Sequence, residues 1–454
     1  MPGASISRWT LSYFAASLVF LILGQVLLAA GFGYPVLPVE APETLVIVHL
    51  IAVGWLGFLF CGALLQFVPV LAATPLRWPG LAAPALILLI AGLLLLCCGF
   101  LRLAGYVDHG PVLLPAGATL LAAGFGLIAA MIGGTLLRAE TMSLSARFVG
   151  LGLLSLVATA LLGFAFALEL SGLVDIEQLH TLLPGGISLH AFFGLVGWMS
   201  VSAFGVSYRL LTMFLLSPEL ERRTTRMVLA LVASSIAAAG VIALALSFGR
   251  DAAASIYLPI LLAAGAGLVF GYDVATIYRA RKRKTLELNS MTSAMAVGAL
   301  MLAILLSLLL LLTGQLEDRI GALLYLITFG WLSLLELGQL YKIVAFMTWL
   351  ECYGPVLGRR PVPKVQELVC ESRGSAWFYL YVVAVAAAVV ALLLGATSAF
   401  QVAALAQTIA AIGLSIELVR TRHLFYVHAG QDEPEAKRPP PLFLPGSLER
   451  SSHR

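Results

Sequence analysis

Two histidines that lie in otherwise apolar stretches are the residues of this chain best suited to chemistry. His49 opens the run H-L-I-A-V-G-W-L-G-F-L-F, and His190 stands near the start of a second apolar run. An ionisable side chain in such a run is costly unless it faces a polar partner or a functional site. Neutral imidazole is a common ligand of haem iron and of transition metals. The alternative is an imidazole that is hydrogen-bonded to a neighbouring carbonyl or hydroxyl group.

Each histidine precedes a Gly-Trp pair that is followed, at a fixed distance, by a second glycine. The unit occurs three times, roughly a third of the chain apart, as Gly54-Trp55 with Gly62, Gly197-Trp198 with Gly205, and Gly330-Trp331 with Gly338. No histidine precedes the third copy. An internal repeat of this kind predicts pseudo-equivalent structural units. We therefore expect three four-helix blocks, at about 9–137, 146–279 and 290–425.

The composition indicates a polytopic membrane protein. Hydrophobic residues make up 61% of the chain and charged residues 11%, and the mean hydropathy is +1.00. About 20 apolar residues span a bilayer as a helix, and the alternation that a barrel requires is absent. The predicted fold is all-α, a membrane domain at 1–425 with about 12 spans, at 9–33, 43–73, 80–101, 113–137, 146–170, 186–216, 225–248, 256–279, 290–313, 320–348, 376–397 and 400–425.

The basic residues predict the orientation of the spans. Lys and Arg gather in alternate loops, including Arg281, Lys282 and Arg283, whereas the loops 34–42 and 171–185 contain none. The positive-inside rule then places both termini in the cytoplasm. We expect a bacterial-type inner membrane protein with a retained signal anchor. The polar, Pro-rich segment 426–454 is expected to be a disordered cytoplasmic tail.

The spacing of the histidines predicts that they share one site. His49 lies five positions before the glycine of its Gly-Trp pair and His190 seven. Two residues of offset turn a side chain by about 200°, so neighbouring helices would present the two imidazoles to the gap between them. Beside His190, Gly194 and Gly197 form a smooth stripe that suits a flat macrocycle. The same stripe equally suits close packing of another helix.

A second polar set lies further along the repeated helices. Glu336 follows Trp331 well inside its span, where desolvation disfavours a carboxylate that lacks a partner. Together with Tyr208 and Tyr341, it is a candidate for a proton path. A hydrogen-bonded structural carboxyl group is the alternative. We find no phosphate-binding loop, Ser/His/Asp set or metalloprotease motif, and nucleic acid is not an expected partner.

The membrane region resembles a known superfamily. Twelve spans in three blocks, with His49 and His190 near the outer ends of spans 2 and 6, look like subunit I of the haem-copper oxidases. The stretch V-H-L-I-A-V-G-W…G-A-L-L-Q-F-V-P-V resembles orphan cytochrome c oxidase subunit I-like membrane proteins, and the general plan is similar to that of NnrS-type haem proteins linked to nitric oxide stress. The resemblance implies that His49 is an axial ligand of a low-spin haem and that His190 is a metal ligand.

The chain departs from that superfamily in its histidine set. The paired histidines that follow span 6 are missing, and Leu323 and Tyr325 stand in the third repeat where His190 and His49 fall. A proximal haem ligand and a three-histidine copper site therefore cannot be built. We do not expect copper or dioxygen reduction by the ordinary mechanism, and the sequence does not decide whether the chain is an enzyme.

These observations favour a b-type haem protein related to oxidase and nitric oxide reductase subunit I. His49 and His190 would be its iron ligands, and electron transfer, haem or nitric oxide handling, or support of a respiratory complex would be its role. Membrane lipid and respiratory or cytochrome c-type subunits are the expected partners. One alternative is a cofactor-free transporter or assembly factor whose histidines and Glu336 line a path. Another is a structural subunit that positions a partner through its tail.

Overall fold

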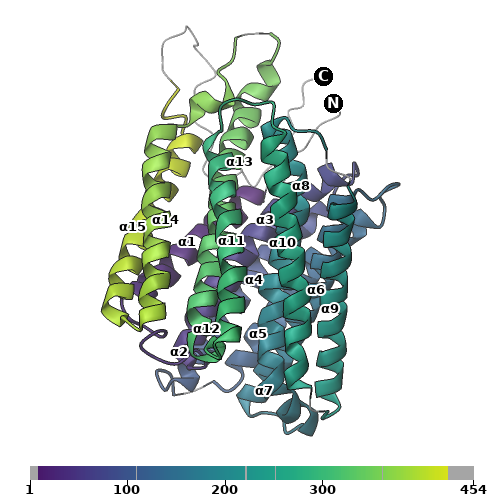
Figure 1. Cartoon of the computed structure of the whole chain (residues 1–454), viewed down its shortest axis with the longest axis vertical. Coiled ribbons are helices and arrows are strands. Elements are labelled where there is room, and N and C mark those ends of the chain that lie inside the picture. The colour runs from purple at the N-terminus through teal and green to yellow at the C-terminus, as the bar shows by residue number, and fades with distance from the viewer. Residues whose placement is uncertain (1–8, 109, 220–221, 251, 360, 428–454) are drawn as a thin grey trace.

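The computed structural model describes residues 9–108, 110–219, 222–250, 252–359 and 361–427. Within these residues twelve helices are long and apolar enough to cross a membrane. Nine of these spans are built on single α-helices, namely α1 (Thr10–Ala29), α4 (Ala82–Leu103), α5 (Leu113–Leu136), α6 (Leu144–Ser171), α9 (Arg223–Ser247), α10 (Tyr257–Arg279), α11 (Leu288–Leu312), α14 (Glu371–Leu394) and α15 (Thr397–Arg422). Figure 1 shows α9, α10, α11, α14 and α15 running along the long axis of the molecule.

The other three spans each contain a π-helical segment between two α-helices. They are α2–η1–α3 (Pro42–His49, Leu50–Gly57, Phe58–Leu71), α7–η3–α8 (Glu177–Ala191, Phe192–Ser200, Val201–Leu215) and α12–η5–α13 (Leu316–Tyr325, Leu326–Ser333, Leu334–Tyr353). Each π-helical segment holds the Gly-Trp pair of its repeat. Such segments are rare and frequently mark functional sites.

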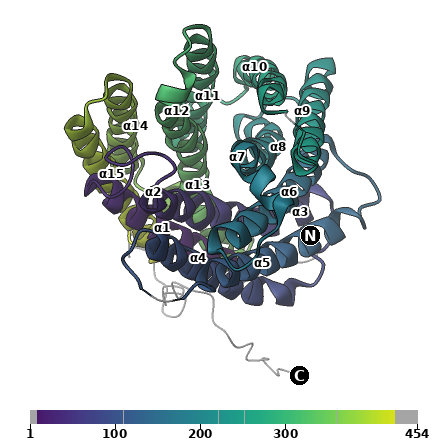
Figure 2. The ribbon, with the colours of Figure 1, turned by 90° about the horizontal axis from the view of Figure 1, so that it is seen from below.

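The three π-containing spans form the inside of the bundle. Their segments η1, η3 and η5 contact one another pairwise. Around them, α4, α5 and α6 follow one another, as do α9, α10 and α11, and α14 and α15; α15 in turn contacts α1. Figure 2, which looks along the helices, shows this arrangement. The inner spans are also the most buried by their neighbours.

Hydrogen bonds between indoles and serines connect the inner spans. The Trp55 Nε1–H donates to Ser333 Oγ at 2.8 Å, and the Trp331 Nε1–H donates to Ser200 Oγ at 3.1 Å. Each serine hydroxyl donates in turn to the carbonyl five residues earlier, Ser200 to Leu195 O and Ser333 to Thr328 O. A hydroxyl group can donate one bond while it accepts another. Each serine therefore serves both its own π-helical segment and the neighbouring tryptophan.

The third connection in this ring is incomplete. Trp198 lies against Gly57, because a Cβ atom added to Gly57 would come within 3.5 Å of the Trp198 ring. Gly57 stands two residues after Trp55, where the other two repeats carry serine. The atom of Trp198 nearest that Cβ position is Cη2, and the buried Trp198 Nε1 has no hydrogen-bond partner among the described residues.

The second glycine of each repeat packs against the span that precedes its own. An added Cβ atom would lie 2.7 Å from Tyr13 Cβ at Gly62, 2.5 Å from Phe148 Cβ at Gly205, and 2.0 Å from Thr292 Oγ1 at Gly338. Small residues allow such close contact between membrane helices. The repeated glycines are thus explained by packing.

The prediction of an all-helical chain with about 12 membrane spans is confirmed. The division into three blocks, the inner membrane location and the cytoplasmic placement of the termini stay predictions. The proposed disordered tail at 426–454 lies, beyond residue 427, outside the described residues.

The incomplete ring generates a stability prediction. Gly57→Ser should let the new hydroxyl accept the Trp198 Nε1–H and donate to Ala52 O, five residues earlier, as the other two serines do. A net gain of about 1 kcal/mol is typical of a hydrogen bond that satisfies a buried donor. The measurement is thermal unfolding of the purified protein in detergent.

Ser333→Ala provides the matched comparison. It removes the acceptor of Trp55 and should cost about 1–3 kcal/mol, because a buried indole N–H is left unpaired. Gly57→Ala controls for helix propensity, since it adds the Cβ atom without the hydroxyl. If Gly57→Ser is no more stable than Gly57→Ala, the hydrogen bond to Trp198 does not form.

Candidate functional site

The structure brings His49 and His190 together. The two imidazole rings lie with their centroids 6.4 Å apart and their planes at 28°. His49 ends α2 and His190 lies in the last turn of α7, so each ring precedes the π-helical segment of its span. Both residues are partly buried, in helices that span the membrane. A pair of rings at this separation is suited to share one bound atom or group.

Both imidazoles are held by the same ring nitrogen. His49 Nδ1 lies 2.8 Å from Leu45 O, and His190 Nδ1 lies 3.0 Å from Thr159 O on α6. A carbonyl oxygen only accepts, so each Nδ1 carries the proton and donates. In the neutral imidazole, Nε2 is then the nitrogen with the free lone pair. Metal-ligating histidines typically show this pattern, in which one nitrogen donates to a backbone carbonyl and fixes the tautomer.

Aromatic rings and a glycine surround the pair. The Phe100 ring centroid lies 5.0 Å from that of His49, and the Phe166 centroid 5.9 Å from that of His190. A Cβ atom added to Gly163 on α6 would come within 2.9 Å of His190 Cε1. The absence of a side chain at Gly163 therefore makes room for the imidazole.

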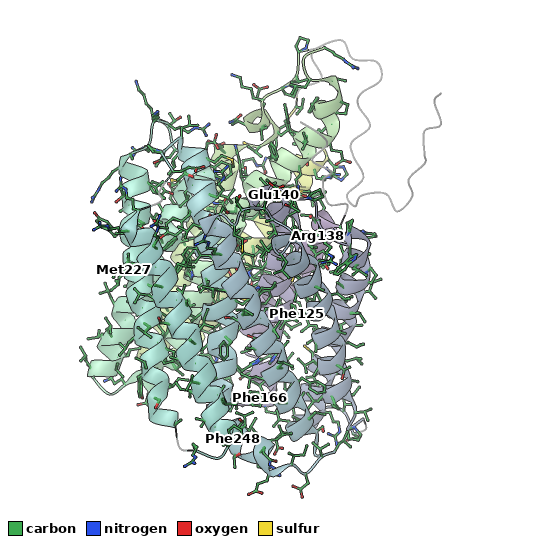
Figure 3. The ribbon with its side chains drawn as sticks, turned by 90° about the vertical axis from the view of Figure 1, so that its right-hand side faces the viewer. Phe125, Arg138, Glu140, Phe166, Met227 and Phe248 are labelled. Atoms are coloured by element: carbon green, nitrogen blue, oxygen red, sulfur yellow. The ribbon has the colours of Figure 1, made fainter. Side chains whose placement is uncertain are left out.

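The histidines and the tryptophans occupy successive levels along the bundle. Phe125, whose ring centroid is 5.4 Å from that of Trp198, lies near mid-height in Figure 3. Phe166, the neighbour of His190, lies toward the end marked by Phe248, and Arg138 marks the opposite end. The histidine pair is thus on the Phe248 side of the tryptophans. This is the side that the distribution of basic residues predicts to be outside.

The glycines predicted to face a cofactor pack against α6. An added Cβ atom would lie 2.6 Å from Ser155 Oγ at Gly197 and 3.5 Å from Thr159 Cγ2 at Gly194. This geometry matches the helix-packing alternative for the stripe. A cofactor-binding role for Gly194 and Gly197 stays a prediction that these contacts do not favour.

The three residues of the predicted proton path lie in different surroundings. The Tyr208 hydroxyl donates to Asp273 Oδ2 of α10 at 2.9 Å, and the Tyr341 hydroxyl to Cys370 O at 3.1 Å. Only Glu336 lines a cavity between the inner spans. The two tyrosines connect inner to outer helices, and the structure does not join them to Glu336.

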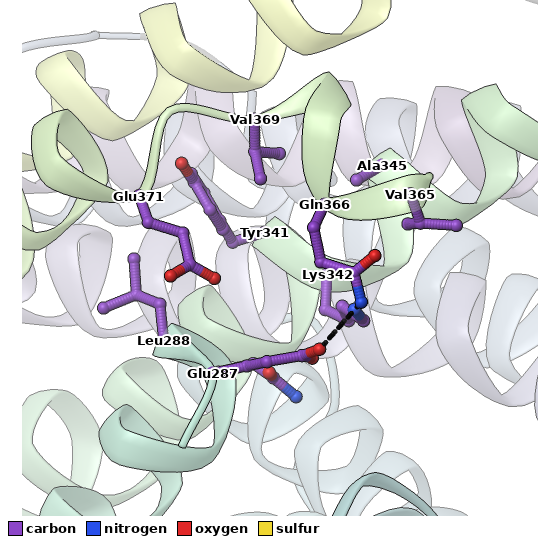
Figure 4. A pocket seen from close by; sticks show the side chains of 10 residues that line it. Glu287, Leu288, Tyr341, Lys342, Ala345, Val365, Gln366, Val369 and Glu371 are labelled. Atoms are coloured by element: carbon purple, nitrogen blue, oxygen red, sulfur yellow. Dashed lines mark hydrogen bonds and ion pairs between the residues drawn. The ribbon is translucent and has the colours of Figure 1, made fainter. Parts of the chain in front are cut away.

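Tyr341 borders a polar pocket that holds an ion-pair network (Figure 4). Lys342 Nζ lies 2.8 Å from Glu287 Oε2, Gln366 Nε2 donates to Glu287 Oε1 at 2.9 Å, and Arg283 pairs with the same carboxylate. Burial raises the pKa of Glu287, but these hydrogen bonds and positive charges outweigh it and hold the pKa below its ordinary value. The network joins the start of α11 to α13.

The two other histidines that the structure describes, His180 and His423, do not join the pair. His180 binds Glu169 and lies 2.9 Å from Asp175 Oδ1, and His423 is the residue that follows the end of α15. His109, His428 and His453 lie outside the described residues. Among the described residues no group of three or more His, Cys, Asp and Glu side chains is placed to hold a metal ion. Any metal at the histidine pair would need ligands from a cofactor or from elsewhere.

Sequence reasoning missed several residues of this region. Ser200 and Ser333, each two positions after a repeated tryptophan, were signalled by the recurrence of Gly-Trp-x-Ser in two of the three copies. The chain shows no comparable signal for Thr159, Gly163 or Gln339, because their roles arise from contacts between distant spans. Comparison with protein-family models and with curated proteins found no match to this chain.

The contact at Gly163 generates a prediction about the His190 ring. Gly163→Ala should force the imidazole to move, at a cost of about 1–3 kcal/mol in unfolding free energy, as is usual for overpacking. The cost should largely vanish in the His190→Ala background, and a double-mutant cycle measures this coupling. Gly240→Ala on α9 is the control, because an added Cβ atom there meets nothing within 4 Å. Equal costs of Gly163→Ala in both backgrounds would place His190 elsewhere.

The Glu287 network generates a pH prediction. Because the folded-state pKa of Glu287 lies below its ordinary value, its stabilising effect is present above that value and is lost as pH falls through the folded pKa. Lowering the pH from about 6 to about 3 should therefore reduce the melting temperature more in the wild type than in Glu287→Gln. At neutral pH Glu287→Gln should be the less stable protein. Parallel pH profiles of the two proteins would contradict this.

Proposed function

We propose that this chain is a membrane haem protein in which His49 and His190 are the two axial ligands of a b-type haem. The observation that carries the proposal is the facing pair of imidazoles, each tied to a backbone carbonyl through Nδ1. The ring centroids lie 6.4 Å apart, and the two histidines would hold the iron through their Nε2 atoms.

The surrounding side chains suit such a group. Phe100 and Phe166 supply apolar rings beside the imidazoles, and each histidine is partly exposed. The carbonyls of Leu45 and Thr159 orient the rings and raise the basicity of each Nε2. A haem iron held by two histidines supplies one-electron transfer. The role proposed for the chain is electron transfer, haem or nitric oxide handling, or support of a respiratory complex in a bacterial-type inner membrane.

Optical spectra of single variants test the proposal. The purified wild type should show a sharp α-band in its reduced-minus-oxidised spectrum and should contain haem on extraction. His49→Ala and His190→Ala should each abolish the six-coordinate low-spin signal, because either change removes an axial ligand. His180→Ala and His423→Ala are matched controls that should leave it unchanged. A colourless, haem-free preparation, or a spectrum indifferent to both pair variants, would exclude the proposal.

A cofactor-free transporter is the second candidate, and one observation favours it. A cavity lined by Glu336 lies between the three inner spans, where transporters commonly hold substrates or coupling ions. A colourless preparation with the histidine contacts intact would favour this function. The third expectation, a structural subunit acting through its tail, concerns residues mostly outside those described.

A further inference from the structure

A cavity lies where α3, α8 and α13 meet. About 30 Å³ of it is open to the centres of water molecules. A buried water needs roughly 10–15 Å³ on this measure, so the cavity has room for water. The lining residues follow the tryptophans along all three inner spans, and the cavity is therefore on the Arg138 side of the tryptophan level.

Three polar side chains line this cavity and the rest of its wall is apolar. Glu336 and Gln339 are three residues apart, on one face of α13, and Ser207 comes from α8. Gln339 Nε2 donates to Ser293 Oγ at 2.8 Å, which fixes the carboxamide. Gln339 is 7% exposed. Its Oε1 atom is buried and has no hydrogen-bond partner among the described residues. An unsatisfied buried acceptor commonly marks a site for ordered water.

Glu336 is the acidic residue in the wall of this cavity. No hydrogen bond or ion pair from its carboxyl group to a described residue is found, and no lysine, arginine or histidine lines the cavity. The wall from α3 is apolar, including Phe60 and Ala63, and the wall from α8 offers only the Ser207 hydroxyl. An unpaired carboxylate is expensive in such surroundings. A neutral carboxylic acid costs much less to bury, and its O–H can donate a hydrogen bond to water.

We propose that this cavity is a hydrated proton-binding site, in which Glu336 carries the proton and water bridges its carboxyl group to Gln339 Oε1. On release, the O–H bond of the acid breaks, the proton passes to the bound water to give hydronium, and the electron pair stays on the carboxylate. Uptake is the reverse. Tyr208 and Tyr341 take no part, because their hydroxyl groups bond elsewhere. This site does not require haem.

Infrared spectroscopy of the protein in lipid nanodiscs tests the proposal. The wild type should show the C=O stretch of a protonated carboxylic acid, which should shift soon after transfer to deuterated buffer, because water reaches the site. Glu336→Gln should lose this band. Gln339→Leu, which keeps the size of the side chain, should slow the deuterium shift and move the band to higher frequency. Asp273→Asn is the control and should leave the band in place, since Asp273 accepts bonds from Tyr208 and Thr224.

The outcomes separate this site from its alternatives. A band that survives in Glu336→Gln places the acid elsewhere. A band that Glu336→Gln removes but that exchanges slowly, at the same rate in Gln339→Leu, shows a dry structural carboxyl group. Loss of the wild-type band on adding Na⁺ at constant pH shows an alkali cation site. Each of these results overturns the proposal. Thermal unfolding of each variant confirms that the protein under test is folded.

Discussion

The bonds from tryptophan indoles to serine hydroxyls are the constraint on which the centre of this bundle depends. In a bilayer, lipid tails are as apolar as leucine, so helices associate through close packing and hydrogen bonds. Ser200 and Ser333 each accept an indole N–H from another span and donate to a carbonyl of their own π-helical segment. The wider turn of η3 and η5 and the contact between spans are thus coupled. Loss of either would expose a polar group to an apolar interior.

This ring also divides the interior into two chemically distinct levels. On the Phe248 side lie two imidazoles, each held by a backbone carbonyl through Nδ1. On the Arg138 side lies a carboxyl group in a cavity large enough for water. The fully buried Trp55 and Trp331 lie between them. The proposed haem site and the proposed proton site would thus lie on opposite sides of the tryptophans, with no residue in common.

Much of the fold was readable from the sequence because membrane physics acts locally. Span existence follows from about 20 consecutive apolar residues, and all twelve spans were predicted. The π-helical segments were not, since a change from i→i+4 to i→i+5 bonding leaves the hydrophobic pattern intact. The Gly-Trp units were recognised as a repeat, but their contacts were not. What a glycine packs against, such as Tyr13 at Gly62, depends on helices that the pattern does not pair.

Part of the candidate site could be predicted from residue spacing and part could not. The difference of two positions between His49 and His190, measured from their Gly-Trp pairs, predicted that the rings face one another, and they lie 6.4 Å apart. The unforeseen π-helical segments η1 and η3 each begin soon after the histidine and contain the glycine of the Gly-Trp pair, so their effects on the angle are similar in the two spans. The three residues of the predicted proton path could not be compared from one shared position in the repeat. Tyr208 and Tyr341 share a register position with each other but not with Glu336, and a register shared within a repeat says nothing about which neighbour a hydroxyl group meets. The internal repeat predicts that Tyr208 and Tyr341 occupy equivalent positions in their spans. It does not predict that either of them lines the cavity beside Glu336.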